Sequence, residues 1–178
     1  PSIFTLFINV IFFKFVYKVI LFKKIFMHQT IQNLIAIQHS INSKLLELKG
    51  KSRIPKIIAV SKTFKIDHIL PLINHGHLDF GENKVQEAVE KWTDIKNKNK
   101  KIKLHLIGKL QTNKVKFAIK IFDYIHSLDS EKLAKKISDE QKKQNLRPKI
   151  FIQINLGNES QKSGILMENL VDFYNFSK

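Results

Sequence analysis

The chain has 178 residues, 43% of them hydrophobic, which is enough for one sizeable core with or without an appendage. It contains no cysteine, which excludes disulfides, thiolate metal sites and cysteine nucleophiles and suits the cytoplasm. The net charge is +16, yet only Arg53 and Arg147 among the 31 basic residues are arginines, the type that readers of bases and phosphates favour. Lys, Ile, Asn and Phe are all abundant, as codons rich in A and T would produce. We therefore attribute the charge to composition and expect no specific nucleic-acid partner.

Residues 1–26 differ from the rest of the chain. The stretch from Ile3 to Phe22 is almost entirely apolar and has the length of a membrane span, about 20 residues, but Lys14 and Lys18 fall inside it. A lysine near the centre of a membrane helix costs about 2.5 to 3.5 kcal/mol. Two interpretations stay open, of which we favour the first: Met27 is the natural start and residues 1–26 are upstream sequence, or they are a membrane anchor. Residues 27–178 are expected to form the folded domain.

The remainder of the chain alternates between two hydrophobic periods. From Ile31 to Leu48 apolar residues recur every three or four positions, which predicts an amphipathic helix. The apolar run that starts after Pro55 predicts a buried strand, which ends in Ser-Lys-Thr at 61–63. Four more strands are predicted at 78–80, 102–107, 124–126 and 149–155, and five more helices at 66–73, 85–92, 115–122, 130–145 and 167–174. A polar loop is expected at 157–164, and Pro71 is expected to kink its helix or mark a late start.

This alternation predicts an α/β fold with a parallel sheet. The five strands begin 19 to 27 residues apart, a period consistent with a (β/α)8 TIM-type barrel. Such barrels typically need about 250 residues, so about five of eight βα units are expected here, as a partial barrel without its last third. An open, doubly wound sheet is the alternative.

Lys62 stands where the first predicted strand ends, and ligands of α/β folds bind beyond the carboxyl ends of the strands. A lysine whose charged form is disfavoured is nucleophilic and can condense with an aldehyde, which suggests pyridoxal 5'-phosphate (PLP) as cofactor. The structural alternative is a solvated surface lysine. The seven histidines lack a recognised metal-ligand spacing, so no metal site is expected.

Five motifs follow the predicted strands in order: Ala-Val-Ser-Lys-Thr (59–63), Phe-Gly-Glu-Asn-Lys-Val-Gln-Glu (80–87), His-Leu-Ile-Gly-Lys-Leu-Gln-Thr-Asn-Lys (105–114), Ile-His-Ser-Leu-Asp-Ser (125–130) and Gln-Ile-Asn-Leu-Gly-Asn-Glu-Ser-Gln-Lys-Ser-Gly (153–164). Together they resemble the YggS/PROSC family of PLP homeostasis proteins. The fold of that family is similar to the N-terminal barrel of alanine racemase.

The resemblance implies that Lys62 holds PLP as a Schiff base and that Asn83 borders the cofactor. His105 also matches the family motif, but alternation places it on the opposite face from Leu104 and Leu106, so a packing role is equally consistent. The family further implies a monomeric, cytoplasmic cofactor-balancing protein with no established catalytic turnover and no catalytic residue.

In the family the cofactor phosphate is held by later strands, so the resemblance also implies a C-terminally truncated member. Three alternatives remain: an inactive remnant of the family, a racemase-like PLP enzyme, and a basic module that binds membranes or nucleic acid. A racemase needs a second acid/base opposite the lysine, which alanine racemase takes from a second domain.

Overall fold

The computed structural model describes residues 27–48, 53–157, 159, 161 and 163–178. The predicted extension at 1–26 lies outside these residues, so both interpretations of it stay predictions. Among the described residues, no helix is both long and apolar enough to cross a membrane. The chain divides into two compact units, of which the first combines residues up to Lys56 with Pro71–His75, and the second comprises Ile57–Leu70 and Gly76–Lys178.

Helix α2 (Gln29–Glu47) is the main described element of the first unit and confirms the helix predicted at 31–48. The ring of His28 caps it, because Nδ1 accepts a hydrogen bond from the backbone N–H of Thr30 at 3.3 Å. Leu34 is its buried residue.

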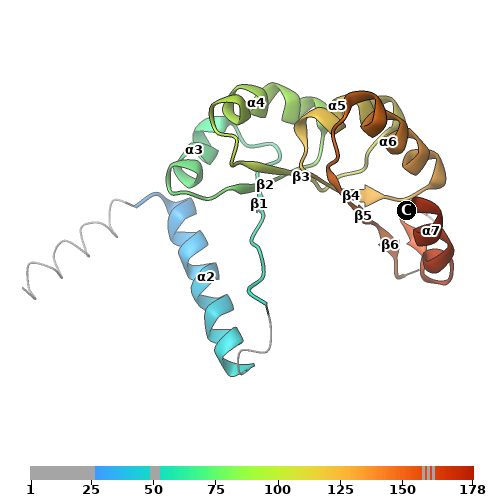
Figure 1. Ribbon diagram of the computed structural model, residues 1–178. Coiled ribbons are helices and arrows are strands. Elements are labelled where there is room, and N and C mark those ends of the chain that lie inside the picture. The colour runs from blue at the N-terminus through green and yellow to red at the C-terminus, as the bar shows by residue number, and fades with distance from the viewer. Residues whose placement is uncertain (1–26, 49–52, 158, 160, 162) are drawn as a thin grey trace, which may run out of the picture. The chain divides into compact units, whose positions relative to one another are not determined.

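The second unit is built on five parallel strands, β1 (Ala59–Val60), β2 (Asp79–Glu82), β3 (Lys103–Leu106), β4 (Tyr124–Leu128) and β5 (Lys149–Ile152). Their order across the sheet is β1-β2-β3-β4-β5. A doubly wound sheet reverses its strand order at a switch point, so this sequential order excludes that alternative. Figure 1 shows α4 (Val85–Lys98), α5 (Val115–Ile121) and α6 (Glu131–Gln144) along one face of the sheet, as in one wall of a barrel.

The core lies between this helical layer and the sheet. Alternate strand residues such as Phe80, Leu104 and Ile125 are fully buried, because period-two alternation directs them all to the helical face. Trp92 of α4 packs on Phe80 with ring centroids 4.8 Å apart. Each such side chain contributes about 1.5 to 3 kcal/mol by leaving water.

The strand predicted at 149–155 is interrupted at Gln153, whose N–H bonds to the carbonyl of Leu128. The next two residues form β6 (Ile154–Asn155), which pairs in parallel with a strand that the sequence did not predict, β7 (Ile165–Leu166). Gly164 permits this pairing, since a Cβ there would lie 2.8 Å from the backbone nitrogen of Asn155. Part of the polar loop expected at 157–164 lies outside the described residues.

Two further helical predictions can be judged. Helix α3 (Ile66–Asn74) contains Pro71 in its interior, so the helix does not start late. The last predicted helix is confirmed as a short 3-10 turn, η2 (Met167–Asn169), followed by α7 (Leu170–Ser177).

Several lysines occupy the ends of helices, which gives them a local structural role. Lys96 and Lys98 lie in the last turn of α4, and Lys142 and Lys143 in that of α6. A cation there is favourable because the helix macrodipole places negative charge at the C-terminus.

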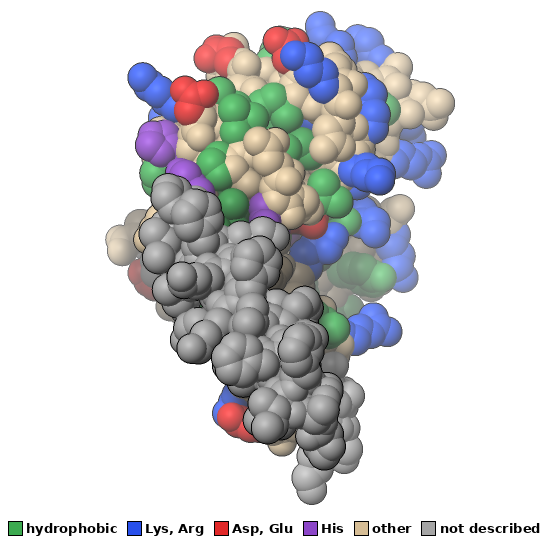
Figure 2. Space-filling view, turned by 90° about the vertical axis from the view of Figure 1, so that its left-hand side faces the viewer, with side chains coloured by type: hydrophobic (Ala, Val, Ile, Leu, Met, Phe, Trp, Pro, Cys, Tyr) green, Lys and Arg blue, Asp and Glu red, His purple; other side chains and the backbone are tan. Residues whose placement is uncertain are grey.

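Figure 2 shows Lys and Arg side chains along the top and right-hand margin of one face, with hydrophobic side chains between them. The absence of a specific nucleic-acid partner stays a prediction.

Candidate cofactor site

Lys62 lies two residues after the end of β1, at the carboxyl edge of the sheet. The residue before it, Ser61, is buried and donates its N–H to the carbonyl of Gly81 at 2.9 Å, which continues the β1–β2 ladder by one step. Lys62 itself is exposed. Within the described part of the chain, no hydrogen bond or ion pair engages its Nζ. The Lys62 amine therefore lies at the carboxyl edge of the sheet, as predicted, and makes no hydrogen bond or ion pair with the described residues.

Thr63 has a φ of 65°, a left-handed conformation that disfavours a β-branched residue. The strain is about 1 to 2 kcal/mol. Its N–H donates to Glu87 Oε1 at 2.7 Å. A hydrogen bond to a charged group contributes about 1.5 to 3 kcal/mol, so this bond is strong enough to offset the strain.

Behind this turn, side chains of α4 form a polar network with Ser61. Glu82 Oε1 accepts hydrogen bonds from Ser61 Oγ at 2.8 Å, Lys91 Nζ at 3.0 Å and Trp92 Nε1 at 2.9 Å. Glu82 is fully buried, and its Oε2 has no hydrogen-bond partner among the described residues. Lys91 Nζ also donates to Glu87 Oε1 and to the carbonyl of Ser61.

The pKa of Glu87 lies below its ordinary value. Burial alone would raise that pKa, but the hydrogen bonds from Lys91 and from the Thr63 N–H, together with the charges of Lys91 and Lys84, outweigh burial. Glu87 is therefore a stable carboxylate acceptor at neutral pH.

Asn83 follows the end of β2, as the sequence predicted, and it is half-buried. The turn after β3 presses on its backbone, because a Cβ on Gly108 would lie only 2.3 Å from the carbonyl oxygen of Asn83. Next to it, Gly81 lies between the side chains of Ile58 and Ile107, each 3.2 Å from where its Cβ would be. The face of the sheet away from the helices is thus apolar near the Lys62 edge.

His105 lies on that same face, opposite to Leu104 and Leu106 as alternation predicts, and it is buried. Its Nε2 lies 3.1 Å from Asp79 Oδ1, its Nδ1 lies 3.0 Å from His126 Nε2, and its ring stacks on Tyr124 at 4.3 Å. With both ring nitrogens engaged, these contacts favour packing over direct cofactor contact. Burial, and secondarily the neighbouring His105, lower the pKa of His126.

A hollow of about 440 Å³ opens at the same carboxyl edge, beyond β3 and β6. Its lining is mixed, with apolar and polar side chains and two charged residues of opposite sign: Ile107, Lys109, Gln153, Ile154, Asn155, Leu156, Gly157, Glu159 and Ser163. A space of this size falls within the range of small-molecule sites.

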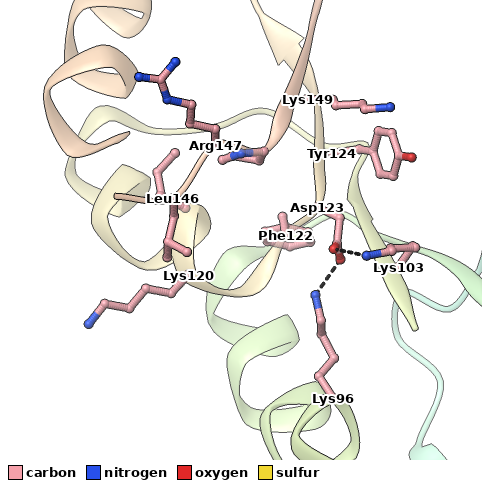
Figure 3. Close-up of a pocket in the computed structure, with 11 residues that line it drawn as sticks. Lys96, Lys103, Lys120, Phe122, Asp123, Tyr124, Leu146, Arg147 and Lys149 are labelled. Carbon is pink, nitrogen blue, oxygen red and sulfur yellow. Dashed lines mark hydrogen bonds and ion pairs between the residues drawn. The ribbon is translucent and has the colours of Figure 1, made fainter. Parts of the chain in front are cut away.

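A second hollow, of about 330 Å³, lies at the amino edge (Figure 3). Asp123 lies at its centre and accepts hydrogen bonds from Lys96 at 2.5 Å and from Lys103 at 3.0 Å. Burial would raise the pKa of Asp123, but these two lysines and the N–H of Leu104 together hold it below its ordinary value. Because the chemistry of barrels sits at the opposite edge, we interpret this hollow as structural.

The sequence analysis named Lys62, Asn83 and His105 as candidate site residues. It did not predict the polar network of Glu82 and the α4 side chains with Ser61 and Thr63. Within this network, four-residue spacing on a helix favours only the Glu87–Lys91 pair, and that ion pair is present at 3.0 Å. The contacts of that pair with Ser61 and Thr63, and the part of Trp92 in binding Glu82, were not foreseen. No local pattern signals them, because they depend on which strand the helix face meets.

The chain matches the family described as alanine racemase, N-terminal domain, over residues 33–178. It is 36% identical to the pyridoxal phosphate homeostasis protein of Pasteurella multocida over 141 residues, 79% of this chain and 60% of that protein. The chain spans about 60% of the length of the curated relatives it matches.

Solved structures agree with this assignment. PipY of Synechococcus elongatus, solved without PLP, is 32% identical with a TM-score of 0.62, over 76% of this chain and 64% of that chain. PipY with PLP bound is 29% identical with a TM-score of 0.61, over 78% of this chain and 64% of that one. Alanine racemase of Clostridium difficile, at 14% identity and a TM-score of 0.56 over 76% of this chain and 36% of its own, shares the fold.

The fold prediction, a partial TIM-type barrel with parallel strands, is therefore confirmed. With a match over most of its length and the sequential sheet of that fold, the chain belongs to the alanine racemase N-terminal domain family.

Proposed function

We propose that this chain binds PLP at the carboxyl edge of the sheet, with Lys62 as the point of covalent attachment, and that it serves PLP homeostasis. The observation that carries the proposal is the Lys62 amine, which makes no hydrogen bond or ion pair with the described residues and lies on the turn that follows β1. Support comes from relatives named pyridoxal phosphate homeostasis proteins and from PipY, which was solved with PLP bound. A monomeric, cytoplasmic protein remains part of the proposal.

The residues at this edge fit the aldehyde and the ring of the cofactor. Lys62 supplies the amine, and Asn83 supplies an amide at the end of the neighbouring strand. Ile58 and Ile107, whose side chains lie on either side of Gly81, supply an apolar floor for the cofactor ring. His105 is proposed to support this floor from the next layer of the same face. The cofactor supplies an aldehyde carbon, to which an amine can bind covalently with loss of water.

Homeostasis rather than turnover is the function we propose. A cofactor-balancing protein must bind PLP reversibly and protect its aldehyde from other amines. An exposed attachment lysine is suited to that exchange, because the bond can form and hydrolyse at the surface of the site. A racemase-like activity would need a second acid/base opposite Lys62.

The test is borohydride reduction of the full chain mixed with PLP, followed by peptide mass mapping. Reduction converts the bond between amine and aldehyde carbon into a stable secondary amine. We expect the label to concentrate on Lys62, well above the exposed Lys65 three residues away. Label spread evenly over the surface lysines would contradict the proposal.

A matched pair of variants completes the experiment. Lys62→Arg keeps the positive charge and removes the nucleophilic amine, so the selective label should disappear. Lys65→Arg makes the same change on the same turn and should leave labelling of Lys62 unchanged.

A further inference from the structure

Lys62 lies between two residues that are both held by side chains of α4. On one side, the carbonyl of Ser61 accepts a hydrogen bond from Lys91 Nζ at 2.9 Å. On the other side, the N–H of Thr63 donates to Glu87 Oε1 at 2.7 Å. The backbone on both sides of the attachment lysine is thus tied to one helix.

Lys91 joins these ties into one network. Its three donor bonds go to the Ser61 carbonyl, Glu82 Oε1 and Glu87 Oε1, at 2.9, 3.0 and 3.0 Å. Its side chain is only 10% exposed and that of Glu82 is 0% exposed. A lysine ammonium has three protons, so Lys91 has no remaining donor.

We propose that Glu82, Glu87 and Lys91 act as positioning residues that fix the Lys62 turn and keep the Lys62 amine free. This inference rests on the proposed function and deepens it, because it names the residues that prepare the attachment site. Lys91 contributes in two ways. It anchors the Ser61 carbonyl, and it pairs with one oxygen of Glu82 and one oxygen of Glu87, so that these oxygens are already engaged beside the Lys62 turn.

The charges of the network support the second contribution of Lys91. Glu82 and Glu87 both pair with the Lys91 ammonium, and the charge of Lys84 also acts on Glu87. A lysine within reach of a carboxylate that lacked such a partner would be attracted to it. Because Lys91 already holds the inward oxygens, Lys62 stays outside and available for an aldehyde.

The first test compares variants of Glu87 by the ratio of Lys62 to Lys65 labelling after borohydride reduction with PLP. Glu87→Ala removes the acceptor of the Thr63 N–H, and we expect the ratio to fall about tenfold, the size expected for a lost hydrogen bond to a charged group. Glu87→Gln keeps an acceptor oxygen and should restore most of the ratio. Gln86→Ala, on the exposed side of α4, is the matched control and should leave the ratio unchanged.

A purely structural role would lower the melting temperature of Glu87→Ala without changing the ratio, and would contradict the proposal. Lys91→Gln tests whether Lys91 keeps the carboxylates from pairing with Lys62. In this variant the freed carboxylates should attract Lys62 and lower its labelling while Lys65 labelling stays constant. Unchanged labelling of Lys62 in Lys91→Gln would also contradict the proposal.

Hydrogen exchange without PLP separates this inference from the proposed function. The amide of Thr63 should exchange about tenfold faster in Glu87→Ala than in the unmodified chain or in Gln86→Ala, since its acceptor is gone. If exchange responds but the unmodified chain shows no selective label on Lys62, the network is real and the PLP function is wrong. If exchange does not respond, the network does not hold the turn and the inference fails.

Discussion

At the amino edge of the sheet, Asp123 binds the ammonium groups of Lys96 and Lys103, whereas at the carboxyl edge the ammonium of Lys62 contacts no acid of the described residues. Both edges carry acids close to lysines. The difference is that Lys91 forms the ion pairs with Glu82 and Glu87 at the carboxyl edge, whereas Lys62 forms none with the described residues.

This contrast shows how a lysine-rich protein can keep one lysine out of the ion pairs that its neighbours form. The chain has a net charge of +16, and most lysines of a folded protein are solvated at its surface. A lysine without an ion pair is therefore not by itself evidence of a function. What distinguishes Lys62 is a braced backbone on both sides and a neighbouring acid pair that another lysine satisfies.

The largest expected effect at the carboxyl edge comes from Glu82→Ala. The change leaves the Lys91 ammonium, the Trp92 N–H and the Ser61 hydroxyl without their shared acceptor. Removing one partner of a buried pair typically costs about 3 to 5 kcal/mol, so the free energy of unfolding in urea should fall by that amount. Glu90→Ala, on the exposed side of α4, should change the free energy of unfolding by less than about 0.5 kcal/mol.

A smaller effect is expected at the amino edge from Asp123→Asn, because its two lysines keep partial access to water. We expect a loss of about 1 to 3 kcal/mol in the free energy of unfolding, with labelling of Lys62 unchanged. Asp94→Asn, an exposed acid of α4, is the control. A loss of Lys62 labelling in Asp123→Asn would show that the two edges are coupled and would remove the contrast.

Acid should weaken the amino edge of the sheet through Asp123. Because the folded pKa of Asp123 is lowered, its contribution is fully present above the ordinary aspartate pKa of about 3.9 and is lost as pH falls through the folded pKa. Stability measured below about pH 4 should therefore fall less steeply in Asp123→Asn than in the unmodified chain.

His126 should make stability depend on pH in a higher range. Its folded pKa is lowered, so the unfolded chain binds protons that the folded chain does not, and stability should decline as pH falls below about 6.5. In His126→Gln this decline should be smaller, as urea unfolding between pH 7.5 and roughly 5.5 would reveal. His39→Gln, on exposed α2, should leave the decline intact.

The smallest effect on stability is expected where the effect on chemistry is greatest. Lys62→Met removes an exposed ammonium that makes no ion pair in the described structure, so the free energy of unfolding should stay within about 0.5 kcal/mol. The selective PLP label should vanish. A large loss of stability would mean that Lys62 is a structural residue after all.

The strands and helices with several regular repeats were predictable from the sequence, because periods of two and of three to four directly report which face is buried. Strand β7 was not, since two residues carry no period and its pairing with β6 depends on the close approach at Gly164. The interruption at Gln153 was likewise not predictable, because Ile150, Ile152 and Ile154 continue the alternation across it.

For the candidate site, Lys62 and Asn83 were predictable because parallel strands direct their carboxyl ends to one edge. The face of His105 followed from alternation, but its bonds to Asp79 and His126 did not, because they join three separate strands. The network of Glu82 with Lys91 could not be predicted either, because sequence spacing does not tell which strand end α4 contacts.

The close approach between Gly108 and Asn83 sets the spacing of the second and third strand ends. An apolar side chain at 108 must push the two turns apart, because its Cβ would lie only 2.3 Å from the carbonyl oxygen of Asn83, and it would add no charge to the site. Position 108 thus offers a mechanical adjustment of the mouth of the site. Under the proposed function, a substitution there would change cofactor exchange while Lys62 and the side chains that hold its turn stay as they are.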